Sequence, residues 1–145
     1  MSPAQRELYV ELPPEAGESP EVVGRLVKSM YGCRDAGRNW EAEVRRAMTS
    51  FGFVPGVSNP CLFYHPQRQL RSMVHGDDFI TEGQMDDLKW LNDQFASVWK
   101  VELRGIFGPK RIQGTVQEIV VLNRLLTWTS EGIELEADPR HVDIT

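Results

Sequence analysis

Residues 61–81 have the sequence CLFYHPQRQLRSMVHGDDFIT, in which short apolar runs alternate with polar turns. The apolar runs lie at 61–65, 70–75 and 79–81, and their length and composition are typical of β-strands. A polar turn at 66–69 separates the first two runs, and Gly76-Asp77-Asp78 separates the second from the third. Glycine and paired aspartates favour a tight reversal of the chain. This stretch therefore predicts neighbouring extended segments with Gly76-Asp77-Asp78 at a hairpin tip.

A helical pattern lies on each side of this stretch. Between 35 and 51 apolar side chains recur at helical spacing, with Asp35 placed to cap the first turn and Gly52 placed to end the helix. Glu41 and Arg45 on the polar side form a favourable i,i+4 pair. A second helix is predicted at 84–96, with Asp86 and Asp87 in its first turn. The expected inward residues are Ala36, Trp40, Val44, Ala47, Met48 and Phe51, then Met85, Leu88, Leu91 and Phe95.

Further extended segments are predicted nearer the two ends of the chain. Residues 7–12 alternate strictly, with Leu8, Val10 and Leu12 on one face, and 22–27 form a second extended piece. After the second helix, strands are expected at 98–104, 119–128 and 133–136, with a turn at Ser130-Glu131-Gly132 and a helix opening at Asp138-Pro139. This order predicts an α+β fold of the split-βαβ kind, with helices on one face of an antiparallel sheet and a C-terminal β-hairpin.

Composition narrows the class of protein. The chain has 145 residues, 41% of them hydrophobic, which fits one domain. No apolar run approaches the ~18 residues that a membrane helix needs, and the first residues lack the pattern of a signal peptide. Two cysteines, Cys33 and Cys61, are too few for a disulfide framework and indicate free thiols. We therefore expect an intracellular protein of the cytoplasm or nucleus, with no membrane partner.

Charge is distributed unevenly along the chain, whose net charge is −5. An acidic total argues against a surface that attracts nucleic acid everywhere. Between 25 and 46, however, six basic side chains stand against only three acidic ones. The six are Arg25, Lys28, Arg34, Arg38, Arg45 and Arg46. Two interpretations stay open, a solvated helix face or a surface that contacts backbone phosphates.

Asp77 and Asp78 are the sharpest candidates for chemistry, because adjacent carboxylates on a turn repel each other and a divalent cation relieves the repulsion. Mg²⁺ prefers oxygen ligands and commonly takes one or two protein carboxylates together with substrate phosphates. Taken alone, Gly-Asp-Asp is more often a plain turn, so the functional interpretation needs further motifs. His65, His75 and His141 lack zinc-ligand spacing, and Trp40, Trp90, Trp99 and Trp128 are expected as core anchors rather than base-stacking platforms.

Further motifs occur in a fixed order around the Gly-Asp-Asp turn. Residues 8–14 are LYVELPP, 25–40 are RLVKSMYGCRDAGRNW, 51–53 are FGF, 59–63 are NPCLF and 73–80 are MVHGDDFI. In this order they resemble the V-Y-x-E-x-P-P, R-L-x-K-[AS]-L-Y-G-L-K-Q-A-P-R-x-W, G-F, D-P-C-L-F and L-V-Y-V-D-D-I-L blocks of the reverse transcriptase of copia-type LTR retrotransposons. Residues 88–95 and, loosely, 132–143 resemble later blocks of that family. The V-H-G-D-D-F variant is similar to copia-like elements of dinoflagellate algae.

The resemblance implies a partial reverse transcriptase palm domain over 1–145, with a palm-like core at 7–104 and a C-terminal hairpin and the start of a helix at 105–145. It implies RNA-directed DNA polymerase activity by two-metal nucleotidyl transfer with Mg²⁺ or Mn²⁺. Asp77 would be the direct metal ligand and Asp78 would support the site. The implied nucleotide or template contacts are Tyr31, Gly32, Lys28, Arg34, Arg38 and His75. The implied partners are an RNA or DNA template–primer, dNTP and the remainder of a polyprotein with its fingers, thumb and ribonuclease H region.

Several positions depart from the family pattern. His75 replaces the usual tyrosine, Gly76 a bulkier residue, Asp35 the usual glutamine and Gly37 a proline. The family's other metal-binding aspartate precedes the Y-x-E-x-P-P segment, and we expect the chain to begin too late to include it. A polyprotein fragment that is inactive alone is therefore expected. The alternative is a noncatalytic α+β nucleic-acid-binding or interaction module, although 71–75 lacks the aromatic side chains that the usual RNA-binding version stacks on bases.

Overall fold

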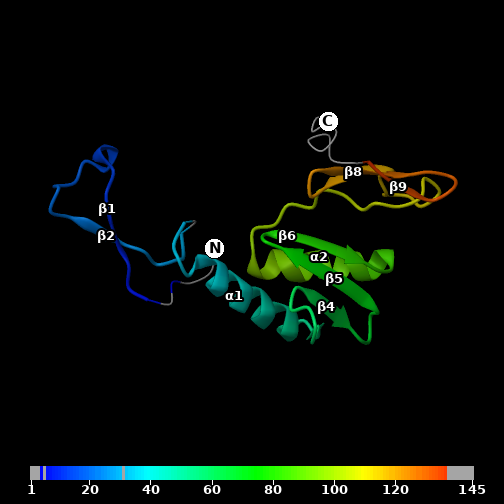
Figure 1. Cartoon of the computed structure of the whole chain (residues 1–145), viewed down its shortest axis with the longest axis horizontal. Coiled ribbons are helices and arrows are strands. Elements are labelled where there is room, and N and C mark those ends of the chain that lie inside the picture. The colour runs from blue at the N-terminus through cyan, green and yellow to red at the C-terminus, as the bar shows by residue number, and fades with distance from the viewer. Residues whose placement is uncertain (1–3, 5, 31, 137–145) are drawn as a thin grey trace, which may run out of the picture. The chain divides into compact units, whose positions relative to one another are not determined.

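The computed structural model describes residues 4, 6–30 and 32–136, and the chain separates into two compact units, Met1–Lys100 and Val101–Thr145. Among these residues, the first unit contains two α-helices, a two-stranded ribbon and a four-stranded sheet, whereas the second contains a three-stranded sheet (Figure 1). All strand pairs within the named strands are antiparallel. The predicted α+β class is therefore confirmed. No helix in the described part of the chain is long and apolar enough to cross a membrane.

The four-stranded sheet contains the three strands predicted over 61–81 and one short strand before them that was not predicted. It consists of β3 (Val54–Pro55), β4 (Leu62–His65), β5 (Leu70–His75) and β6 (Asp78–Glu82), in that spatial order. Along β4 and β5 side chains alternate between buried and exposed positions, so Phe63 and Ser72 face inward as a cross-strand pair. The strands are short and each is joined to the next along the chain, which makes their register a local property of the sequence.

Helix α1 (Ala36–Ser50) and helix α2 (Met85–Val98) have the predicted positions. Gly52 follows α1 with a φ of +94°, a conformation in which a side chain would be strained, so the predicted stop is confirmed. Asp35 stands at the N-cap of α1, but its carboxylate makes no capping hydrogen bond. The ion pair on α1 joins Glu43 to Arg46 at 2.8 Å, in place of the Glu41–Arg45 pair that the sequence suggested.

The core of the first unit lies between the two helices and one face of the sheet. Its buried members come from α1, the segment after it, β4, β5 and α2: Val44, Met48, Phe53, Phe63, Leu70, Leu91 and Phe95. Because β4 and β5 contribute to this cluster with the same face, both helices cover one side of the sheet, as predicted. Within the described residues of the first unit no helix covers the other side of the sheet, its open side, where Leu62 and Tyr64 are exposed. Asp78 and His75, which pair across β5 and β6, alternate onto this open side.

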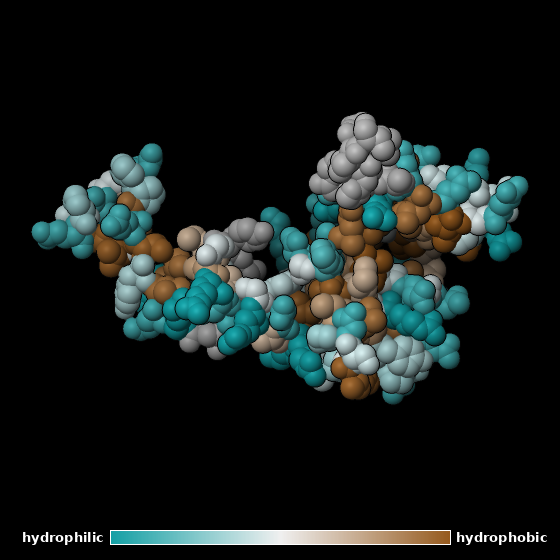
Figure 2. All heavy atoms as spheres, viewed as in Figure 1, coloured by the Kyte–Doolittle hydropathy of each residue, from teal (hydrophilic) through white to brown (hydrophobic). Residues whose placement is uncertain are grey.

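The N-terminal ribbon pairs β1 (Tyr9–Glu11) with β2 (Val23–Arg25), and a 3₁₀ turn at Pro14–Ala16 follows β1. Its alternation agrees with the prediction, because Leu8, Val10 and Leu12 are partly buried while Tyr9 and Glu11 are exposed. Apolar side chains remain at the surface of this ribbon, as the brown spheres at its place in Figure 2 show.

The second unit differs from the prediction. The sheet contains β7 (Glu118–Val121), β8 (Arg124–Trp128) and β9 (Ile133–Leu135). The run predicted as one strand over 119–128 is interrupted at Leu122 and Asn123, whose positive φ values form a two-residue hairpin turn. The expected C-terminal hairpin is therefore a three-stranded sheet. The turn at 130–132 into the last strand is confirmed, since Thr129 N donates to Gly132 O at 2.8 Å.

The prediction of a strand at 98–104 is wrong. Val98 is the last residue of α2, and 101–104 are exposed residues outside any strand. Alternation alone does not make a strand, because a strand also needs a neighbour with which to exchange backbone hydrogen bonds. The helix opening at Asp138-Pro139, and His141, lie outside the described residues.

Candidate functional site

The Gly-Asp-Asp turn forms the tip of the β5–β6 hairpin. Gly76 and Asp77 are its two loop residues, and His75 pairs with Asp78 across it. Gly76 has a φ of +61°, the conformation that a glycine supplies at the first position of a two-residue hairpin loop. Asp77 is exposed and Asp78 is partly buried as the first residue of β6. The structure therefore places two consecutive carboxylates on a tight, accessible turn.

A tryptophan of α1 contacts this turn directly. Trp40 Nε1 donates a hydrogen bond of 2.6 Å to the carbonyl oxygen of Gly76. The Trp40 ring also lies against Phe79 and Trp99, with ring centroids 6.4 and 5.4 Å away. Sequence reasoning treated Trp40 as a core anchor and as the last residue of the family-like block 25–40, without a hydrogen-bonding role. The need of a partly buried indole N–H for an acceptor is the signal that could have indicated the second role.

The donor set at the turn consists of oxygens. Two adjacent carboxylates fit Mg²⁺, which combines one or two protein carboxylates with water and phosphate oxygens. Within the described ranges no cluster of three or more His, Cys, Asp or Glu side chains is placed to hold a metal ion. Asp77 and Asp78 could contribute two carboxylate ligands to a divalent cation site, and further ligands would have to come from outside the described turn.

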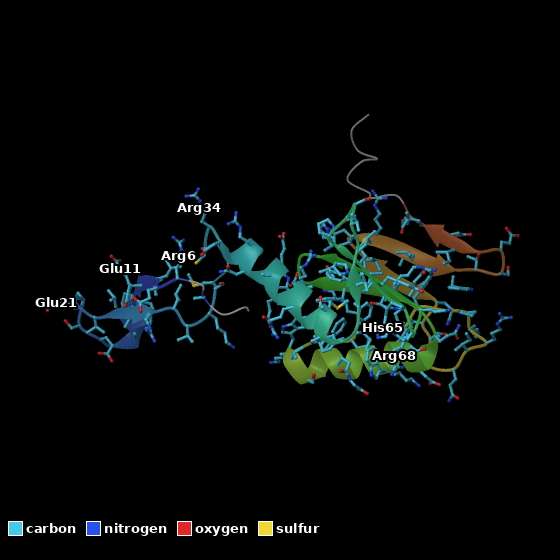
Figure 3. All side chains as sticks on the ribbon, turned by 90° about the horizontal axis from the view of Figure 1, so that it is seen from below. Arg6, Glu11, Glu21, Arg34, His65 and Arg68 are labelled. Carbon is cyan, nitrogen blue, oxygen red and sulfur yellow. The ribbon has the colours of Figure 1, made fainter. Side chains whose placement is uncertain are left out.

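Basic side chains meet at the start of α1. Arg6, Arg34, Asp35 and Arg38 line an open hollow of about 350 Å³. Arg6 holds Asp35 with two hydrogen bonds, Nε to Oδ2 and Nη2 to Oδ1, both of 3.1 Å. Figure 3 shows Arg6 and Arg34 projecting near this end of the helix. Among the described residues, three guanidinium groups against one carboxylate give the hollow an excess of two positive charges, which suits a phosphate ligand.

The structure brings together only part of the predicted basic stretch. Arg34 and Arg38 share the hollow, whereas Lys28 is exposed and does not line it. Gly32 is exposed, with a φ of +92°, just before α1. Tyr31 lies outside the described residues. The remaining arginines have other partners or positions, since Arg25 pairs with Glu7 and Arg46 with Glu43, and Arg45 is exposed on α1.

Arg6 was missed by sequence reasoning. It lies 29 positions from its partner Asp35, outside any recognised motif, and no periodicity connects the two residues. The proximity becomes visible only when the segment before β1 lies against the start of α1. Electrostatic pairing over such a separation leaves no pattern in a single sequence.

A second group of polar residues lies around His65 and serves packing instead. His65 is 6% exposed, its Nε2 lies 3.1 Å from Phe51 O, and its Nδ1 accepts the Arg68 backbone N–H at 3.2 Å. The Arg68 guanidinium lies 3.9 Å from the Trp90 ring centre and bonds Asp87 at 2.6 Å. Figure 3 shows His65 and Arg68 beside α2. His65 is a core histidine with both ring nitrogens engaged, and Trp90 packs against the core, as predicted for that tryptophan.

The open face of the sheet has a hollow of its own. Leu62, Tyr64, Met73 and Ile80 contribute apolar walls to a space of about 610 Å³, and Arg71 and Glu82 close one side with an ion pair of 2.6 Å. The hydrogen bond from Arg71 to Glu82, together with the negative charge of Glu82, raises the pKa of the Arg71 guanidinium. This hollow lacks the cationic surplus of the one at α1.

Comparison with known proteins connects the chain to transposable elements. No family model and no solved structure matches it. It is 32% identical over 81 residues to the retrovirus-related Pol polyprotein from transposon RE2 of Arabidopsis thaliana, and 31% identical over 81 residues to that from transposon RE1. Each match covers 53% of this chain and 6% of the relative. Over about half its length, the chain is thus similar to a short segment of retrotransposon Pol polyproteins.

Proposed function

We propose that the chain is palm-subdomain sequence of a copia-type retrotransposon reverse transcriptase, in which Asp77 and Asp78 hold a divalent cation for nucleotide addition. The observation that carries the proposal is the Gly76-Asp77 loop, which presents both carboxylates at the end of a sheet whose helices cover the opposite face. The similarity to Pol polyproteins of transposons supports the same assignment.

Asp77, Asp78 and His75 would have different roles in such a site. Bound Mg²⁺ would lower the pKa of a primer hydroxyl and neutralise triphosphate charge. Asp77, exposed in the loop, would be the direct ligand, while Asp78 at the start of β6 would support it. His75 pairs with Asp78 across the hairpin and would face the template or nucleotide on the open side of the sheet.

The second part of the proposed site is the hollow lined by Arg6, Arg34, Asp35 and Arg38, which we call the arginine hollow. Arg34 and Arg38 show no ion pair within the described residues, so both guanidinium groups are available to phosphate oxygens. Arg6 is a further candidate, but Asp35 already engages it at 3.1 Å. We assign this hollow to phosphates of the nucleotide or of a template–primer. Because the chain spans 6% of its relatives, dNTP, nucleic acid and the rest of a polyprotein are proposed partners.

A noncatalytic nucleic-acid-binding module is the competing function, and one observation favours it. The described residues contain no third acidic ligand near the turn, so the arginine hollow could bind phosphates without any chemistry following. The two functions differ in whether the turn binds metal.

Titration with Mn²⁺ separates them. Paramagnetic line broadening in the purified chain should affect the amides of 76–79 first, and Asp77→Asn should remove the effect by deleting one anionic ligand. Asp93→Asn on the exposed side of α2 is the matched control and should leave the broadening unchanged. Broadening centred elsewhere would refute the metal site. The chain alone should not extend a primer, because positioning of both ions and the substrate is most of this catalysis.

A further inference from the structure

The hydrogen bond between Trp40 and Gly76 has a position that matters for the proposed metal site. The accepting oxygen belongs to the peptide group that joins Gly76 to Asp77, so the indole holds the backbone of the residue that carries the exposed carboxylate. Donor and acceptor are 36 residues apart and come from α1 and from the β5–β6 loop. The distance between the indole nitrogen and the carbonyl oxygen is 2.6 Å, slightly below the usual range of about 2.7–3.2 Å for such bonds.

The turn is closed by the pairing of His75 with Asp78, and the indole adds a contact from outside the hairpin. A side-chain carbon added at Gly76 would meet no atom within 4 Å, so no neighbouring group packs against the loop at that point. Trp40, in contrast, is held firmly, because its ring packs against Phe79 and Trp99 and these two stack on each other with ring centroids 5.5 Å apart. The indole N–H therefore links a two-residue loop to a fixed aromatic cluster.

We propose that Trp40 is a positioning residue for the divalent cation at Asp77 and Asp78. The inference rests on the proposed function. By fixing the Gly76–Asp77 peptide, the indole N–H limits the orientations of a loop whose two carboxylates repel each other before the cation arrives. A ligand pair already held in place loses less conformational freedom on binding, which favours the bound state. Trp40 touches neither the cation nor a substrate, and acts through the backbone alone.

The test compares two tryptophan variants of the whole chain. Trp40→Phe keeps an aromatic ring in the cluster but removes the donor, whereas Trp99→Phe removes a neighbouring indole for which the described chain shows no side-chain hydrogen bond. The readouts are the Mn²⁺ concentration at half-maximal broadening of 76–79, the Asp77 amide nitrogen shift and the denaturation midpoint. We expect Trp40→Phe to weaken Mn²⁺ binding about 3- to 10-fold, the range that one hydrogen bond spans, and to shift the Asp77 amide. Trp99→Phe should change the denaturation midpoint without either effect.

The outcomes separate this role from the metal site itself. If Mn²⁺ broadens 76–79 equally in the wild type and in Trp40→Phe, the positioning role is overturned while the metal site stands. Equal weakening by both variants also overturns it, because general packing would then explain the change. If Mn²⁺ leaves 76–79 of the wild type unaffected, the proposed metal site is refuted, and the role of Trp40 with it.

Discussion

Removing the Asp35 carboxylate should strengthen phosphate binding at the start of α1. Asp35 is the only acid among the described residues that line the hollow, and both of its oxygens are taken by Arg6 at 3.1 Å. Asp35→Asn removes one negative charge, raises the excess of positive charge in the hollow from two to three, and releases the Arg6 guanidinium. The fold should survive, because the pair is partly solvated, with side-chain exposures of 54% and 28%, and such pairs contribute about 0–1 kcal/mol.

The expected gain in affinity for phosphate follows from the negative charge that is removed. A phosphate placed about 6 Å from a carboxylate is repelled by roughly 0.7 kcal/mol in water and by about 2.8 kcal/mol at an effective dielectric constant of about 20. The hollow is open and Arg6 is more than half exposed, so the weaker value applies. We therefore expect affinity for a template–primer duplex to rise about 3-fold at low salt. If Arg6 then binds a phosphate, the slope of log K against log salt becomes more negative by about 0.9.

Fluorescence anisotropy with a labelled duplex, measured over a series of salt concentrations, provides the assay. Asp93→Asn is the matched control, since it makes the same change in charge and side-chain shape on the exposed side of α2. Equal gains from both variants would show that net charge, and not the hollow, governs binding. Weaker binding by Asp35→Asn would refute the reasoning in another way, because Asp35 would then be holding Arg6 in its productive orientation.

Two further predictions concern the arginine hollow and the end of α1. Charge reversal at Arg34 and Arg38 should weaken duplex binding and make it less salt-dependent, with the slope of log K against log salt falling in magnitude by about 0.9 for each phosphate that the protein no longer binds. Charge reversal at the exposed Arg111 and Arg124 should weaken binding less. Equal effects of both pairs in the anisotropy assay would leave only nonspecific attraction. Gly52→Ala should lower the free energy of unfolding by about 1–2 kcal/mol, because φ is +94° and a Cβ would lie 3.0 Å from His65 Nε2. Gly37→Ala in α1, where a Cβ meets nothing within 4 Å, should be neutral or stabilising in the same urea titration, and similar losses at both glycines would contradict the backbone argument.

Local signals explain which parts of the fold could be predicted from sequence. The strand Leu70–His75 and the loop at Gly76 and Asp77 follow from residues within a dozen positions of one another, and the structure has them as expected. The helix Ala36–Ser50 follows from one apolar stripe and a terminal glycine. In the second half of the chain the same method was wrong twice, at 98–104 and at Leu122 and Asn123. Alternation at 98–104 lacked a pairing strand, and the 122–123 turn uses left-handed residues that are not glycine.

In the candidate site, too, local features could be predicted from sequence and long-range contacts could not. Asp77 and Asp78 were predictable because the chain itself brings them together. The interactions that surround them, Trp40 to Gly76 and Arg6 to Asp35, join segments 36 and 29 residues apart and depend on how α1 packs. Such interactions arise only in the tertiary structure, so no local pattern in the sequence indicates them.

Helix α1 connects the two halves of the proposed site. Arg38 lines the phosphate hollow, and Trp40, two residues later, bonds the loop of the carboxylates. Two residues of a helix are about 3 Å apart along its axis and point about 200° away from each other, so one rigid turn presents a cation outward and a hydrogen-bond donor inward. Val44 and Met48, which are buried one and two turns further on, hold that helix against the sheet. The distance between a phosphate bound by Arg38 and a cation at Asp77 would therefore depend on this packed helix, to which the loop of Asp77 is tied by Trp40. A reaction that depends on positioning requires such support.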